Sequence, residues 1–96
     1  MILASFGALA LVALAGCGHP ASVEECDVLF KKSAEIELKA QPNNDDPKRL
    51  EEQIESARAA PQGTGFMSRC VGRRITARAL ACVRGAATAD QMDRCF

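Results

Sequence analysis

The sequence predicts a small all-α domain, cross-linked by disulfides, behind an N-terminal export segment. Apolar residues beyond position 21 recur at intervals of three and four, the spacing of a helix with one buried face. No stretch alternates polar and apolar residues with period two, so no sheet is expected. Five cysteines are many for a chain of 96 residues. A core this small rarely supplies more than about 3–5 kcal/mol, so covalent cross-links are expected.

Residues 1–16 are expected to form an export signal. The run from Met1 to Ala15 is apolar or small throughout and carries no charge. Its length is near the upper limit for the apolar region of a signal peptide and short of the roughly 20 residues that a spanning helix needs. No Lys or Arg follows Met1, although export signals normally begin with a basic region.

The apolar run ends in Leu14-Ala15-Gly16-Cys17. This segment resembles the lipobox of bacterial lipoproteins, in which a branched apolar residue and two small residues precede a cysteine. The resemblance implies that Cys17 is acylated on sulfur and becomes the mature N-terminus when the preceding bond is cut. Two or three acyl chains give stable anchoring, where one alone is marginal. An ordinary secretory signal, or a membrane anchor with a buried cysteine, is the alternative.

The lipobox resemblance also implies a domain organisation and a location. Residues 1–16 are the lipoprotein signal peptide, residues 17–21 a lipidated tether, and residues 22–96 a four-cysteine helical domain. The protein is expected in the cell envelope, anchored to a membrane through the lipid on Cys17. Gly18 rather than Asp follows this residue, which in Gram-negative systems permits transport to the outer membrane, facing the periplasm or the cell surface. Because the tether is short, the domain should lie close to the bilayer.

Four to five short helices are expected in the domain. The first runs from Ser22 to about Ala40, because Ser22 and Glu25 fit a capping box. After the helix-breaking residues 41–45, a second helix begins with Asp46 as its cap and Pro47 at its first position, and it continues to Pro61.

The remaining helices are shorter. Residues 61–65 contain Pro and two Gly, and we expect a loop there. A third helix is expected over residues 66–73. Thr76 is the expected cap of a fourth helix that ends near Gly85, and Thr88 the cap of a last helix over the C-terminal residues.

Four cysteines are left once Cys17 is acylated, namely Cys26, Cys70, Cys82 and Cys95. An even number in an exported domain indicates two disulfides, because that compartment is oxidising. No Cys-x-x-Cys pair is present, so neither a redox centre, a zinc site nor a haem attachment is indicated, and we expect no metal and no cofactor. The single histidine, His19, lies in the expected tether.

Two pairings of these cysteines agree with the expected turns. A turn near residues 85–88 lets Cys82 meet Cys95, which leaves Cys26 to join Cys70. A turn near residues 73–75 also permits Cys70 to join Cys82, with Cys26 then joined to Cys95. The sequence favours the first pairing and leaves the second open.

The C-terminal part resembles a further group of proteins. Cys70, the Thr-capped helix ending in Cys82-Val83, the Thr88 cap and Cys95 are similar to features of small four-cysteine helical lipoproteins of Gram-negative bacteria, most of them of unassigned function. The resemblance implies a fold and a location and no activity.

Charges are unevenly distributed although the net charge is zero. Acidic residues dominate residues 22–55, whereas residues 56–89 contain no acid and six arginines: Arg58, Arg69, Arg73, Arg74, Arg78 and Arg84. Arg69, Arg73, Arg74 and Arg78 are a candidate surface for an anionic partner. The competing hypothesis, which we favour here, pairs these arginines with Glu51, Glu52, Glu55 and the acids of the first helix, because internal pairing would produce net neutrality.

Three classes of function remain open from the sequence. The first, which we expect, is a non-enzymatic envelope module that binds a protein or lipid partner or has a structural role; the second is a small inhibitor of an envelope hydrolase. An enzyme is the least favoured, because no Ser-His or Cys-His pair is available beyond the expected tether. Tyr and Trp are absent and only four Phe are present, which argues against stacking on nucleic acid.

Overall fold

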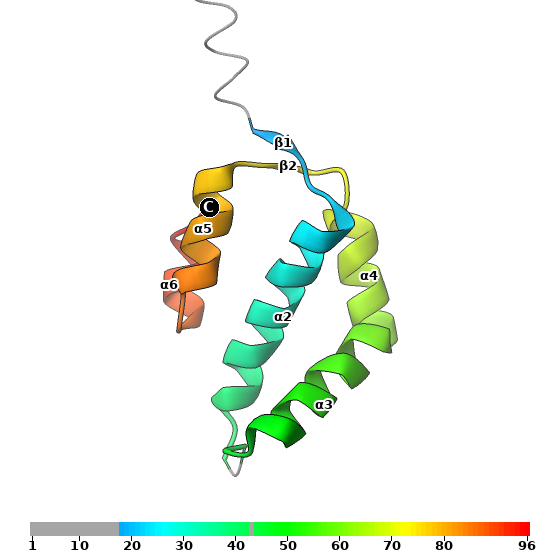
Figure 1. Ribbon diagram of the computed structural model, residues 1–96, viewed down its shortest axis with the longest axis vertical. Helices are drawn as coiled ribbons and strands as arrows, with labels where there is room; N and C mark the ends of the chain where they lie inside the picture. The colour runs from blue at the N-terminus through cyan, green and yellow to red at the C-terminus, as the bar shows by residue number, and fades with distance from the viewer. Residues whose placement is uncertain (1–17, 43) are drawn as a thin grey trace, which may run out of the picture.

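The computed structural model describes residues 18–42 and 44–96, and these residues form a small all-α fold with two disulfides (Figure 1). The expected export signal and Cys17 lie outside the described residues. The elements, in chain order, are β1 (His19–Pro20), α2 (Val23–Lys39), α3 (Pro47–Ala59), α4 (Pro61–Cys70), β2 (Arg74–Ile75), α5 (Ala77–Gly85) and α6 (Ala89–Asp93). The expected all-α class is confirmed.

Helix α2 is the central element. The expected capping box is present, because the Ser22 side chain accepts from the Glu25 backbone N–H and the Glu25 carboxylate accepts from the Ser22 backbone N–H. Helices α3 and α4 lie along one side of α2, with α5 and α6 on the other (Figure 1). The apolar face of α2 therefore supplies much of the core, with Cys26, Leu29, Phe30 and Ala34 all buried.

Helix α4 begins five residues earlier than the sequence predicts. The expected loop at 61–65 is wrong, because Pro61 opens the helix directly after α3 ends. Gly63 is buried there, and a Cβ on it would meet the backbone carbonyls of Ala57 and Arg58. The glycine is thus a point of close approach between α3 and α4 rather than a sign of a loop.

The same helix also ends earlier than expected. It stops at Cys70, and Gly72 adopts a φ of 90° that favours glycine. Arg73 was expected in this helix but lies in the connection to β2. Val71, directly after the helix, is 43% exposed.

A small antiparallel sheet corrects two further expectations. β1 pairs with β2, with His19 opposite Ile75 and Pro20 opposite Arg74. Strands of two residues are too short to show a period of two in the sequence. The pairing also takes residues 18–21 into the fold, where Ala21 is only 4% exposed. The described residues of the expected tether are therefore part of the domain.

Two disulfides join the described cysteines. Cys26 of α2 is bonded to Cys70 at the end of α4, and Cys82 of α5 is bonded to Cys95 after α6. This is the first of the two pairings considered from the sequence. Among the described residues, no helix is both long enough and apolar enough to span a membrane.

Candidate functional site

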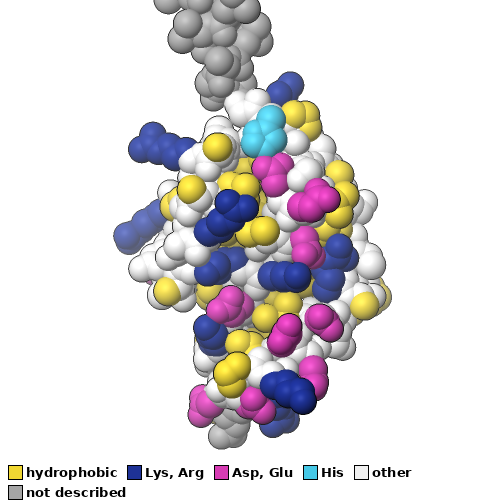
Figure 2. Space-filling model, in the orientation of Figure 1, with side chains coloured by type: hydrophobic (Ala, Val, Ile, Leu, Met, Phe, Trp, Pro, Cys, Tyr) yellow, Lys and Arg dark blue, Asp and Glu magenta, His cyan; other side chains and the backbone are white. Residues whose placement is uncertain are grey.

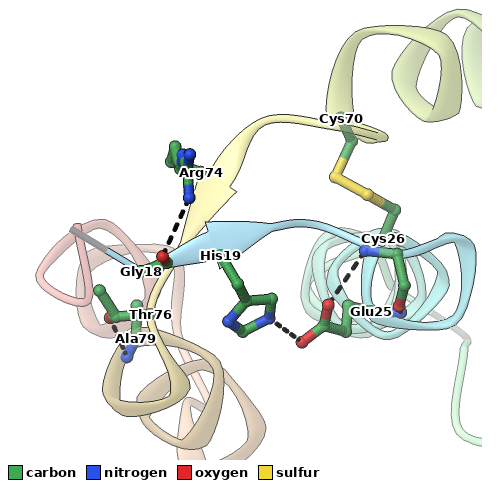
Figure 3. A network of polar contacts seen from close by, with 9 residues as sticks. Gly18, His19, Glu25, Cys26, Cys70, Arg74, Thr76 and Ala79 are labelled. Carbon is green, nitrogen blue, oxygen red and sulfur yellow. Dashed lines mark hydrogen bonds and ion pairs between the residues drawn. A yellow bond between two sulfur atoms is a disulfide. The ribbon is translucent and has the colours of Figure 1, made fainter. Parts of the chain in front are cut away.

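The sheet holds the residue that follows Cys17 against the body of the domain. The Ala21 N–H donates to the Arg73 carbonyl over 2.6 Å, and the Gly72 N–H donates to the Ala21 carbonyl over 2.9 Å. Arg74 Nη1 donates to the Gly18 carbonyl over 3.1 Å (Figure 3). Gly18 has a φ of 79°, and a Cβ there would meet the Ile75 carbonyl. The chain therefore enters the fold at Gly18 in a fixed conformation.

His19 and Glu25 reinforce this entry. His19 Nε2 lies 2.7 Å from Glu25 Oε2, and the other carboxylate oxygen accepts from the Ser22 N–H over 3.0 Å (Figure 3). The hydrogen bond from the Ser22 backbone, followed by that from His19, lowers the pKa of Glu25 below its ordinary value. One carboxylate thus links β1 to the first turn of α2.

The candidate arginines are not paired as the sequence analysis favoured. Arg69, Arg73, Arg74 and Arg78 are exposed, and none of them forms an ion pair with any residue that the structure describes. Basic side chains project from the surface near the N-terminal end of the domain (Figure 2). Glu51, Glu52 and Glu55 lie on α3. The four arginines lie on other segments: Arg69 at the end of α4, Arg73 in the connection that follows it, Arg74 on β2 and Arg78 on α5.

Arg58 is the member of the basic stretch that does pair with the first helix. Its Nε donates to Asp27 over 2.9 Å, and Lys31 lies 3.0 Å from the other oxygen of the same carboxylate. The hydrogen bond from Arg58 is the largest cause of a lowered pKa of Asp27, and the contact with Lys31 is the second. Arg58 therefore fixes α3 to α2 and is not available at the surface formed by the other arginines.

Three of the arginines surround a hollow of about 320 Å³. Arg69, Arg73 and Arg74 line it together with the apolar residues Ala21, Leu29, Phe66, Cys70, Ile75 and Phe96. We call this feature the arginine hollow. It combines positive charge with an apolar floor, so it suits a ligand that carries both an anionic and an apolar group.

Exposed apolar side chains gather near the same end of the molecule. Val23, Val71 and Phe96 are the large hydrophobic residues left exposed in the described part of the chain, at 54%, 43% and 71%. Val23 lies two residues after Ala21, which lines the arginine hollow. Val71 directly precedes Gly72, whose N–H donates to the Ala21 carbonyl. Phe96 itself lines the hollow. Apolar and basic side chains are thus presented together beside the entry of the chain.

The structure brings together some of the sequence-predicted site residues and leaves others apart. Arg69, Arg73 and Arg74 meet at the arginine hollow, whereas Arg78 lies on α5 outside its lining. Cys17 lies outside the described residues. Ile75 and Phe96 also line the hollow and were not predicted from the sequence, although an apolar residue directly after two arginines was an available signal for Ile75.

No group of three or more His, Cys, Asp or Glu side chains is arranged to hold a metal ion within the described parts of the chain. No family model matches this chain, and no curated protein and no solved structure is found to be significantly similar to it.

Proposed function

We propose that this protein is a lipid-anchored envelope lipoprotein whose small helical domain acts as a non-enzymatic binding module at the membrane. The proposal combines the Leu14-Ala15-Gly16-Cys17 lipobox with one structural observation. Gly18, the residue directly after the proposed lipid anchor, is hydrogen-bonded to Arg74 and leads straight into β1. A lipid on Cys17 would therefore hold the domain at the bilayer surface without a free linker.

The surface chemistry supports a binding role. The arginine hollow presents three guanidinium groups without an acidic partner among the described residues, over an apolar floor. Guanidinium groups bind carboxylates and phosphates through two parallel hydrogen bonds. A module of this kind acts by holding an anionic partner.

The proposed location agrees with the two disulfides. Disulfides persist in exported proteins and are rare in reducing compartments, and Cys26–Cys70 and Cys82–Cys95 are both closed in the structure. We propose the outer membrane, facing the periplasm or the cell surface, because Gly18 follows Cys17.

Metabolic labelling with a palmitate analogue tests the anchor. The full chain is expected to incorporate the label and to fractionate with membranes, whereas Cys17→Ser should do neither, because the acylated thiol is lost. Cys17→Ser leaves the four disulfide cysteines in place, so a change in fold does not explain the result. Label that persists in Cys17→Ser would refute the assignment.

A further inference from the structure

We propose that the arginine hollow, with the exposed Val23, Val71 and Phe96 beside it, is a docking surface for anionic phospholipid of the membrane that holds the protein. This inference rests on the proposed function, because the anchor on Cys17 is what brings the surface to the bilayer. The phosphate lies against the guanidinium groups of Arg69, Arg73 and Arg74, and the glycerol and first methylene groups lie on the apolar floor.

The position of the proposed anchor favours a membrane lipid as the ligand of the arginine hollow. In the sequence, Cys17 is joined directly to Gly18 by a peptide bond. The Gly18 carbonyl in turn accepts a hydrogen bond from Arg74 over 3.1 Å, and Ala21 donates to Arg73. Two arginines of the hollow are therefore bonded to the few residues that follow the anchor, and the leaflet is the nearest anionic surface.

The charge distribution supports the same occupant. Residues 56–89 contain six arginines and no acid, and the arginines of the hollow are exposed. Acidic residues are concentrated in α2 and α3, and the start of α3 lies at the end of the domain opposite to the sheet (Figure 1). The three arginines of the hollow therefore lie at the anchored end of the domain, where an anionic leaflet attracts positive charge. Glu24 and Glu25 lie at the same end, in the first turn of α2.

The apolar side chains give the surface its second component. Stable membrane attachment requires two signals, such as acyl chains together with a basic surface or buried apolar side chains. Phe96 is 71% exposed and lines the hollow, and Val23 and Val71 are exposed near the same residues. When the domain docks, these apolar side chains are buried at the headgroup level of the bilayer, while the arginines remain beside the phosphates. The docked domain is consequently fixed in orientation as well as held near the bilayer.

Vesicle co-sedimentation of the unlipidated domain tests this surface. Residues 18–96 suffice, because both disulfides, every described helix and the core cluster lie within them. Binding is expected to vesicles of phosphatidylcholine mixed with phosphatidylglycerol and not to vesicles of phosphatidylcholine alone. It should weaken as salt rises, because exposed charges are screened beyond about 8 Å at physiological ionic strength.

A matched pair of variants locates the binding. Arg73→Ala with Arg74→Ala should weaken vesicle binding by roughly 30-fold, the product of the contributions of two basic residues at an anionic surface. Lys48→Ala with Arg49→Ala removes the same charge from the exposed start of α3 and should change binding less than about twofold. An equal loss of vesicle affinity in both double variants would overturn the proposal, because it would mean that the vesicles attract any basic residue of the domain and not the arginine hollow in particular.

A fluorescent reporter tests the contact of Phe96 with lipid. The chain contains no Trp and no Tyr, so Phe96→Trp introduces a single fluorophore at the hollow. Its emission should shift to shorter wavelength on vesicles that contain phosphatidylglycerol, whereas Glu52→Trp, at an exposed position of α3, should not shift. Circular dichroism of all variants establishes that they are folded.

The remaining outcomes separate this inference from the proposed anchor. No binding to anionic vesicles by the folded domain refutes the docking surface, while labelling of Cys17 is measured independently and can still succeed. Binding to an acidic peptide that contains an aromatic residue, in preference to anionic vesicles, refutes the lipid and identifies a protein ligand instead.

Discussion

Glu25 joins two elements at the entry of the chain, β1 and α2. Its carboxylate accepts from the Ser22 backbone and contacts His19, so it links the capping box of α2 to β1. The hydrogen bond from Ser22 is the first cause of its lowered pKa, and the contact with His19 is the second. A carboxylate whose pKa is lowered by folding stabilises the folded state at pH values above its ordinary pKa of 4.5.

The pH dependence of stability tests this role of Glu25. The contribution of the carboxylate should be present at pH 7 and lost as the pH falls below 4.5 and through the lowered pKa of the folded state. Glu25→Gln keeps an acceptor for the Ser22 N–H but does not ionise. Urea unfolding should therefore show the wild type more stable than Glu25→Gln at pH 7, with the difference closing as the pH falls below 4.5 and through the lowered pKa. A difference independent of pH would contradict this explanation.

At the scale of elements, the junction of α3 and α4 shows how a glycine can belong to a helix. α3 ends at Ala59 and α4 begins at Pro61, so the chain changes direction within two residues. Gly63 lies in the first turn of α4 against the carbonyls of Ala57 and Arg58. A glycine inside a helix costs about 1 kcal/mol relative to alanine, and the close packing of the two helices offsets that cost.

Replacing Gly63 tests the close approach. Gly63→Ala places a methyl group against backbone carbonyls that have little freedom to move, and it should lower the free energy of unfolding by about 1–3 kcal/mol, as overpacking does. Gly85→Ala is the matched control, because a Cβ there meets nothing within 4 Å and should be neutral or stabilising by up to about 1 kcal/mol. Thermal unfolding of both variants measures the difference, and a neutral Gly63→Ala would contradict the packing argument.

At the scale of the whole molecule, the two disulfides divide the fold into parts. Cys26–Cys70 closes 44 residues and joins α2 to the end of α4, and Cys82–Cys95 closes 13 residues between α5 and the residues after α6. Cys26 is fully buried at the centre of the core, whereas Cys82 is exposed. The long bridge therefore fixes the arrangement of the α2–α3–α4 unit, and the short one fixes the C-terminal pair of helices.

Replacing the cysteines of each disulfide in turn tests how much each bridge contributes to the free energy of unfolding. Loop-closure entropy gives a loss of about 4 kcal/mol for Cys26→Ala with Cys70→Ala and about 3 kcal/mol for Cys82→Ala with Cys95→Ala. The first variant also removes buried sulfur from the core. The two variants should therefore differ in free energy of unfolding by more than loop-closure entropy alone predicts. Urea unfolding at equal protein concentration measures both. A larger loss of unfolding free energy in Cys82→Ala with Cys95→Ala would contradict this division, because it would mean that the C-terminal pair of helices contributes more to stability than the α2–α3–α4 unit.

The sequence was most informative where a local interaction decides the structure. Caps at Ser22, Asp46, Thr76 and Thr88 all accept the backbone N–H bonds that begin α2, α3, α5 and α6, because a cap depends on residues two or three positions away. The start of α4 was missed for the opposite reason. Gly63 and Gly65 indicate a loop by composition, and only the contact of Gly63 with α3 shows why the helix contains a glycine at position 63.

The amino-acid sequence alone specifies the helical periodicity and the caps, because these follow from the chemistry of near neighbours, and its cysteine count permits two disulfides. The tertiary structure decided what depends on distance. It brought Gly18 to Arg74, 56 residues away, and so took the expected tether into the fold. It also paired Arg58 with Asp27 but left Arg69, Arg73 and Arg74 without an acidic partner among the described residues. Whether a charge is neutralised is a property of packing, since Coulomb attraction depends on separation in space and not along the chain.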